Sequence, residues 1–180
     1  MQIAALSLRR ATASDLDAIM AIERAPGYDA LVGRSTRLEH EAMLADPRHG
    51  YFVGAREVVE AFAILRDFAD PHGNLYLKRI AVATPGRGDG AGLLGALLDW
   101  AFAETAAHRF YLDCFADNFR AQAMYGKLGF SRDGVLREAY LAPDGRRCDL
   151  VLMALTKPEW LSRGAGGKLQ PRRSSTTSAP

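Results

Sequence analysis

The segment that most constrains the fold is a glycine-rich turn, Arg87-Gly88-Asp89-Gly90-Ala91-Gly92. It follows the β-rich run Leu75–Val82 and precedes a helical pattern from Gly90 to about Thr105. Glycines let backbone N–H groups approach an anion closely, and a helix start adds free N–H groups and a positive dipole end. The turn therefore predicts a phosphate or pyrophosphate site, with Arg87 adding a charge-assisted contact. A tight strand-to-helix turn without any ligand would also explain glycines here.

Two other phosphate motifs fit the turn less well. A P-loop needs Gly-Lys-Ser or Gly-Lys-Thr at the end of the loop, whereas this chain has Ala91-Gly92-Leu93. A dinucleotide fingerprint needs a third glycine where Leu93 stands. That second motif stays open because Asp113 follows about twenty residues later, near the end of an expected strand.

The order of the expected elements indicates the fold class. Strands are expected over Ser7–Arg10, Tyr51–Ala55, Val58–Leu65, Leu75–Val82, Phe110–Phe115, Val135–Leu141 and Asp149–Leu155. Helices are expected after the start signal Thr12–Asp15, from about Arg37 to Leu44, from Gly90 to about Thr105 and from Asn118 to Leu128. Strands followed by strand-helix-strand-helix-hairpin predict an α/β (α+β) fold in which helices cover a mixed sheet.

One domain accounts for most of the 180 residues. Residues 1–163 are expected to form it. From Gly164 to Pro180 the chain is rich in Gly, Ser and Thr and has too few apolar residues to offset the entropy of ordering them. We therefore predict a flexible tail over residues 164–180.

Charge and composition exclude several classes of protein. The net charge of +2 gives the molecule no field suited to nucleic acid, and no apolar run approaches the length of a membrane span. The four histidines are scattered, so no metal site is expected. Cys114 and Cys148 each lie in an apolar run and are expected to be buried thiols, which suits a cytoplasmic protein. The sequence is compatible with a homodimer and does not decide the oligomeric state.

Two motifs in the right order resemble those of the GNAT superfamily of N-acetyltransferases. Ile80-Ala81-Val82 followed by Arg87–Gly92 is similar to the acetyl-CoA signature of that family, Arg/Gln-x-x-Gly-x-Gly/Ala. Asn118, Met124-Tyr125 and Gly129-Phe130 resemble its second motif, an Asn followed by a helix that bears a Tyr and ends in Gly-Phe. The ending of the chain is most similar to the branch of ribosomal-protein N-terminal acetyltransferases, through Gly134, Arg137, Gly145, Asp149 and Leu152-Met153.

The resemblance implies a mostly antiparallel sheet, with helices on both faces and a splayed central strand pair that binds acetyl-CoA. It implies that backbone groups of Ala81 and Val82 pair with the pantetheine arm, and that Arg87, Gly88, Gly90 and Gly92 hold the pyrophosphate. Asn118 would lie near the pantetheine amides, although an N-cap role explains it equally well. Tyr125 would lie near the cofactor sulfur as general acid, so Tyr125 and Asn118 form the expected catalytic set.

The expected reaction moves an acetyl group from acetyl-CoA to a primary amine by direct attack in a ternary complex. A backbone N–H near Val82 is the candidate donor to the developing oxyanion, and Tyr125 is the candidate proton donor to the thiolate. Lys78 and Arg79 stand where some relatives carry a catalytic Glu, which leaves Asp113 or water relays as the base. An α-amine is neutral roughly 14% of the time at pH 7 and a lysine amine only about 0.04%, which favours α-amino acceptors.

The acceptor is therefore expected to be an amino acid, a small amine or a protein N-terminus. Loops commonly carry specificity, so the segments 28–37 and 136–147 are expected to select it. Two other functions stay open: a non-catalytic acyl-CoA-binding sensor, which would use the same fold, and a nucleotide-binding oxidoreductase.

Overall fold

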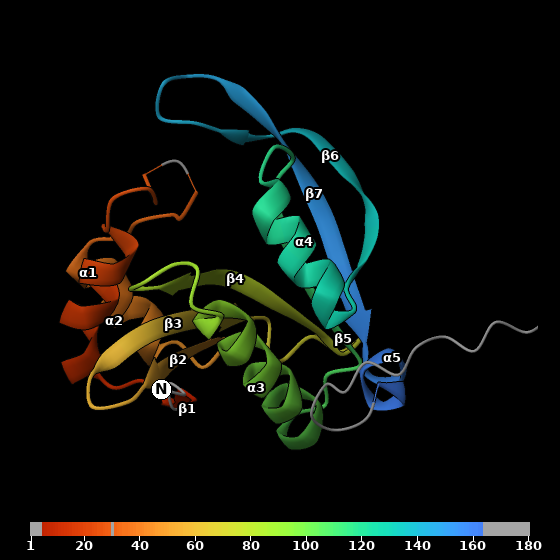
Figure 1. The fold of residues 1–180 in the computed structure, drawn as a ribbon, viewed down its shortest axis with the longest axis horizontal. Coiled ribbons are helices and arrows are strands. Elements are labelled where there is room, and N and C mark those ends of the chain that lie inside the picture. Colours follow the sequence, from red (N-terminus) through yellow and green to blue (C-terminus); the bar gives the residue numbers. More distant parts are fainter. Residues whose placement is uncertain (1–4, 30, 164–180) are drawn as a thin grey trace, which may run out of the picture.

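The computed structural model describes residues 5–29 and 31–163, and Figure 1 shows its ribbon. In this part of the chain seven strands form one sheet in the order β1-β2-β3-β4-β5-β7-β6. The strands are β1 (Ser7–Arg10), β2 (His49–Ala55), β3 (Val59–Arg66), β4 (Asn74–Val82), β5 (Arg109–Phe115), β6 (Ser131–Leu141) and β7 (Arg147–Thr156). The predicted mixed, mostly antiparallel sheet is confirmed, since only β4 and β5 pair in parallel.

The parallel pair is incomplete, and this shapes the centre of the sheet. β4 and β5 pair only between Asn74–Leu77 and Arg109–Leu112. Beyond that point β4 runs on along β3 to Val82, while β5 runs on along β7 to Phe115. The two strands therefore separate and leave a wedge-shaped gap, the splayed pair that was predicted. We call the space between residues 78–82 of β4 and residues 113–115 of β5 the gap.

Helices cover both faces of the sheet. The helices are α1 (Leu16–Glu23), α2 (Arg37–Ala45), α3 (Asp89–Glu104), α4 (Phe119–Leu128) and α5 (Lys157–Ser162), with a short 3-10 turn η1 (Ala13–Asp15) before α1. In Figure 1, α1 and α2 lie together beside β2 and β3, whereas α3 crosses in front of the sheet. The hairpin of β6 and β7 extends beyond the other strands next to α4.

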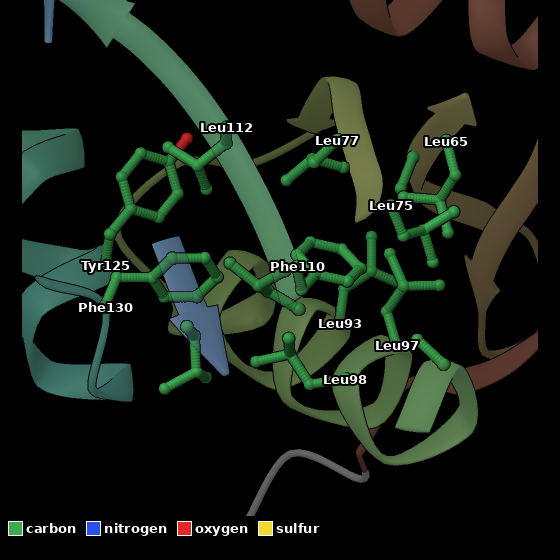
Figure 2. Close-up of a cluster of buried hydrophobic side chains, with 14 of the residues drawn as sticks. Leu65, Leu75, Leu77, Leu93, Leu97, Leu98, Phe110, Leu112, Tyr125 and Phe130 are labelled. Carbon is green, nitrogen blue, oxygen red and sulfur yellow. The ribbon is translucent and has the colours of Figure 1, made fainter. Parts of the chain in front are cut away.

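Alternating residues of β3 divide the core into two clusters. Ala61, Ala63 and Leu65 belong to the cluster of α3 and α4, while Phe62 and Ile64 belong to that of α1. This is the period-two alternation of a strand buried on both faces. Figure 2 shows the larger cluster, in which Phe110 of β5 lies among the leucines of α3. The spacing of those leucines, Leu93, Leu94, Leu97 and Leu98, puts all four on one buried helix face.

Some elements differ from the sequence-based expectation. β6 begins at Ser131, four residues before the expected start. The sequence did not indicate α5, whose Trp160 donates through Nε1 to Asp99 at 2.9 Å. Cys114 is buried as expected, but the prediction for Cys148 was wrong. At Cys148 the strand β7 has passed the end of its pairing with β5 and pairs only with β6, which leaves the side chain partly exposed. The predicted tail, residues 164–180, lies outside the described residues. Among the helices that the structure describes, none is long and apolar enough to cross a membrane.

Candidate active site

The gap exposes backbone groups of β4. Ala83 N–H donates to the Glu60 carbonyl on β3 at 2.7 Å. Residues two apart direct their backbone groups to the same side of a strand, so Ala81 also faces β3, opposite Phe62. Val82, one residue away, directs its N–H and C=O into the gap. Of the two strand residues expected to meet the pantetheine arm, only Val82 presents backbone groups there that no strand pairs with.

Tyr28 reaches these edge groups from the loop between α1 and α2. Its hydroxyl donates to the Val82 carbonyl at 2.8 Å and accepts from the Val82 N–H at 3.2 Å. The ring is partly buried against the cluster of α1 and β2. Sequence reasoning placed Tyr28 only in a loop expected to select the acceptor, and no local signal pointed to a contact across 54 residues.

The glycine-rich turn joins β4 to the N-terminus of α3. Gly88 is the N-cap and has φ +86°, a left-handed conformation that a glycine adopts without strain. Gly90 and Gly92 lie within the helix, so conformation does not require glycine there. A Cβ on Gly92 would meet nothing within 4 Å, and one on Gly90 would make only ordinary contacts, at 3.5 Å or more. The protein therefore leaves room at the surface of α3 where side chains at positions 90 and 92 would lie.

Charged side chains surround this turn. Arg56 donates to Asp89 at 2.7 Å and to Glu60 at 2.7 Å. Arg87 lies farther from both carboxylates, 3.6 Å from Glu60 and 3.7 Å from Asp89. These distances exceed hydrogen-bond length, so the donors of Arg87 are free to turn toward an anion. Because Arg56 neutralises the Asp89 carboxylate, the positive end of the α3 dipole is not cancelled at this turn.

Asn118 caps α4. Its side-chain oxygen accepts from the Ala121 N–H at 3.1 Å. The N-cap role that was considered for Asn118 is therefore observed. Gln122, one turn later, fixes the same corner by donating to the Phe115 and Ala116 carbonyls. Both bonds lie where β5 ends, so Asn118 stands at the mouth of the gap on the β5 side.

Tyr125 lies beneath β5, on the side of α3 and α4. Its side chain is 6% exposed, and its ring packs 5.8 Å from the Phe130 ring. Figure 2 shows the phenol oxygen directed toward Leu112. Among the described residues the hydroxyl has no hydrogen-bond partner. Burial raises the pKa of the phenol well above its ordinary value, and Cys114 and Asp113 add to the rise. The group stays protonated and has an uncommitted proton.

Asp113 lies on the opposite face of β5 from Tyr125. Leu112 and Cys114 point into the α3 and α4 cluster, so Asp113 between them points away from it. It is the first residue of β5 after the last parallel pair with β4, at the apex of the gap. Its carboxylate accepts from the Tyr76 hydroxyl at 2.8 Å. Burial raises the pKa of Tyr76, and the charge of Asp113 raises it further.

Cationic groups lie across the gap from Asp113. Lys78 is the extra residue of a β-bulge, since Leu77 and Arg79 pair with the adjacent residues Leu65 and Ile64 of β3. Burial lowers the pKa of Lys78, and the charges of Arg79 and Arg66 lower it further, against the opposing effect of Asp113. This end of the gap therefore combines one carboxylate with a positive local field.

A buried polar network behind β4 was missed by sequence reasoning. Glu23 is fully buried and accepts from Arg79 at 2.7 Å, while His40 lies between Glu23 at 3.2 Å and Tyr51 at 2.9 Å. Burial raises the pKa of Glu23, but hydrogen bonds from His40 and the Ser35 N–H and the charge of Arg79 outweigh burial and lower it. The sequence signal that could have indicated this network is a glutamate, Glu23, on the apolar face of α1.

The described residues include no group of three or more His, Cys, Asp or Glu side chains that could hold a metal ion.

The topology of the sheet argues against the dinucleotide-binding alternative. A doubly wound fold needs a mostly parallel sheet, and here one pair of six is parallel. Asp113, the residue that kept this alternative open, bonds Tyr76 instead.

The gap, the glycine-bearing helix start and the buried tyrosine together define an acyl-CoA-dependent transferase fold. Residues 16–130 match the acetyltransferase (GNAT) family. The chain belongs to that family, which confirms the predicted resemblance.

Solved structures show the same fold. The chain is similar to the spermidine N-acetyltransferase from Vibrio cholerae in complex with CoA and spermine, with a TM-score of 0.76, 23% identity and coverage of 87% of this chain and 98% of that one. It is also similar to the ribosomal-protein-S18-alanine N-acetyltransferase from Escherichia coli, with a TM-score of 0.69 and 26% identity. That match covers 83% of this chain and 92% of that one.

Proposed function

We propose that this protein transfers the acetyl group of acetyl-CoA to the α-amine of an amino acid, a small amine or a protein N-terminus. The observation that carries the proposal is the gap itself. At one end it has a helix start with an open glycine surface, and at its apex a protonated Tyr125 and the carboxyl group of Asp113 lie on opposite faces of β5.

The residues around the gap fit acetyl-CoA as donor substrate. The N–H groups of the first turn of α3, with Gly90, Gly92 and Arg87, would hold the pyrophosphate. The edge groups of Val82 would pair with the pantetheine arm, and Asn118 lies on the β5 side of the same mouth of the gap. Ala81 would contribute to packing, since its backbone groups face β3.

The two faces of β5 would divide the proton transfers. Asp113 would accept a proton from the amine on the face of α1, directly or through water, and the neutral amine would attack the acetyl carbon. The Val82 N–H would stabilise the negative charge that develops on the acetyl oxygen. Tyr125, on the face of α4, would give its proton to the departing thiolate. The proton that the nitrogen loses as the amide forms would pass to water and restore the phenol.

Charge supports an acceptor with one amine. Burial lowers the pKa of Lys78, and the positive charges of Arg79 and Arg66 lower it further; this positive field opposes the approach of a second or third ammonium group. A single α-amine is attracted by Asp113 and needs little help to lose its proton. We therefore expect an acceptor that differs from the polyamine of the Vibrio cholerae relative.

Thiol release tests the proposal. The protein is incubated with acetyl-CoA and a panel of α-amino peptides, free amino acids and spermidine, while thermal shifts are recorded with acetyl-CoA and with NAD. We expect stabilisation by acetyl-CoA alone and thiol release with α-amines. Stabilisation without thiol release for any amine would instead indicate an acyl-CoA sensor, and stabilisation by NAD alone would reject the family-based function.

The reducing cytoplasm is the proposed compartment, supported by the unpaired, buried thiol of Cys114. A homodimer stays a prediction, which light scattering of the purified protein would test.

A further inference from the structure

The hydroxyl of Tyr28 lies at the point where an acyl oxygen would bond β4. It is 3.2 Å from the Val82 nitrogen and 2.8 Å from the Val82 oxygen, so it satisfies both edge groups of this residue. The Val82 N–H is the donor that the proposed function assigns to the acetyl oxygen. An acyl oxygen can accept from that N–H only if the Tyr28 oxygen moves away from it.

The loop that bears Tyr28 is tied to β4 at a second point. Glu23, at the end of α1, accepts from Arg79 of β4 at 2.7 Å and from the Ser35 N–H at 3.2 Å. Arg24 closes the loop by donating to the Ser35 carbonyl at 2.5 Å. Both ends of the loop are therefore attached three residues from Val82 on the same strand. Tyr28 stays beside the gap when its bond to Val82 breaks.

The phenol is well suited to take a new acceptor in that place. Its ring packs against the α1-side cluster, which holds the side chain, while the hydroxyl projects out of that cluster to polar backbone atoms. If an acyl oxygen takes the bond from the Val82 N–H, the displaced hydroxyl would remain beside that oxygen, and rotation of its O–H would direct the proton to it.

We propose that Tyr28 is a catalytic residue whose hydroxyl fills the acyl-oxygen position in the free enzyme and joins the Val82 N–H as a second oxyanion donor in the complex. This rests on the proposed function. No proton is transferred in this role: the hydroxyl donates a hydrogen bond while the carbon–nitrogen bond forms. The electron pair of the oxyanion then re-forms the carbonyl as the carbon–sulfur bond breaks, and the negative charge leaves with the thiolate. Removing one such donor lowers kcat by about 10²–10³.

The test compares wild type with Tyr28→Phe, and with Tyr111→Phe as a control that also removes the hydroxyl of a partly buried tyrosine. Calorimetry gives the Kd of CoA, acetyl-CoA and S-ethyl-CoA, a thioether that lacks the acyl oxygen. We expect kcat of Tyr28→Phe to fall by roughly 10², with the Kd of CoA unchanged. The preference of wild type for acetyl-CoA over S-ethyl-CoA should shrink in Tyr28→Phe alone.

Three results would overturn this role. A kcat within threefold of wild type would exclude a second oxyanion donor. Tighter acetyl-CoA binding at unchanged kcat would make Tyr28 a competitor for Val82 only, and an equal loss of affinity for all three ligands would make it a packing residue. If Tyr28→Phe does not fold, the wild-type Val82 amide resonance must respond differently to acetyl-CoA and S-ethyl-CoA, and equal responses reject the proposal. Failure of wild type to bind acetyl-CoA rejects the proposed function itself.

Discussion

Replacing Tyr125 by Phe separates chemistry from packing. The ring contact with Phe130 at 5.8 Å is kept, and the hydroxyl has no hydrogen-bond partner among the described residues to lose. The melting temperature should therefore stay within about 2 °C of wild type, since a change in ΔG near zero shifts it little. Loss of a general acid lowers kcat by about 10²–10⁴, which corresponds to about 3 to 5 kcal/mol of activation free energy.

Steady-state kinetics and calorimetry measure the two effects on Tyr125→Phe. The loss should appear equally in kcat and kcat/KM, because the proton is given only in the transition state, while the Kd of acetyl-CoA stays unchanged. Burial raises the pKa of Tyr125 above its ordinary value of 10.0, so the phenol is still protonated at pH 10. Ionisation of Tyr125 should therefore cause no decrease in kcat up to pH 10. A decrease of less than threefold in kcat would refute the acid role and leave Tyr125 as a core residue.

Four further predictions follow from the same structure. Gly90→Val puts a side chain on the open surface of α3 and should weaken acetyl-CoA binding at least tenfold by calorimetry, about 1.4 kcal/mol, whereas Gly95→Ala should not; unchanged affinity would move the pyrophosphate site elsewhere. Asp113→Asn should lower kcat at least tenfold at pH 7, with a smaller loss above about pH 8, where an α-amine is already mostly neutral; a pH-independent deficit would contradict the base role. Phe110→Ala should cost about 3 to 5 kcal/mol in urea unfolding because the side chain is fully buried, and a loss below 1 kcal/mol would show that the cluster collapses around it. Ending the chain after Arg163 should leave melting temperature and turnover intact, and a drop of several degrees would show that residues 164–180 bind the domain.

Local patterns were enough to predict the framework of the site. The glycine-rich turn, the leucine spacing of α3 and the Asn-to-Gly-Phe helix each lie within about twenty residues of chain, and each has its own physical signature. These patterns predicted the order of elements, the fold class and the family. Tyr125 and Asn118 came from the same motifs, although only resemblance, and not spacing, suggested what they do.

The arrangement of side chains around the gap depends on contacts that no local pattern encodes. Tyr28 meets Val82 across 54 residues, and Glu23 meets Arg79 across 56. Such pairs depend on how the strands align in the sheet, and a one-residue change of register reverses the face that each side chain occupies. The bulge at Lys78 makes such a change within β4.

The bulge has a direct effect on the site. Without it, Leu77 and Arg79 would share one face of β4, as residues two apart do in a regular strand. With the extra residue, Leu77 stays in the apolar cluster of α3, while Arg79 turns to Glu23 on the opposite face. The amino-acid sequence by itself predicted the strands and all helices but α5, and its glycine-rich turn predicted a phosphate site. Only the tertiary structure decided which strand face receives each polar group, because register and bulge positions are settled by packing between distant segments.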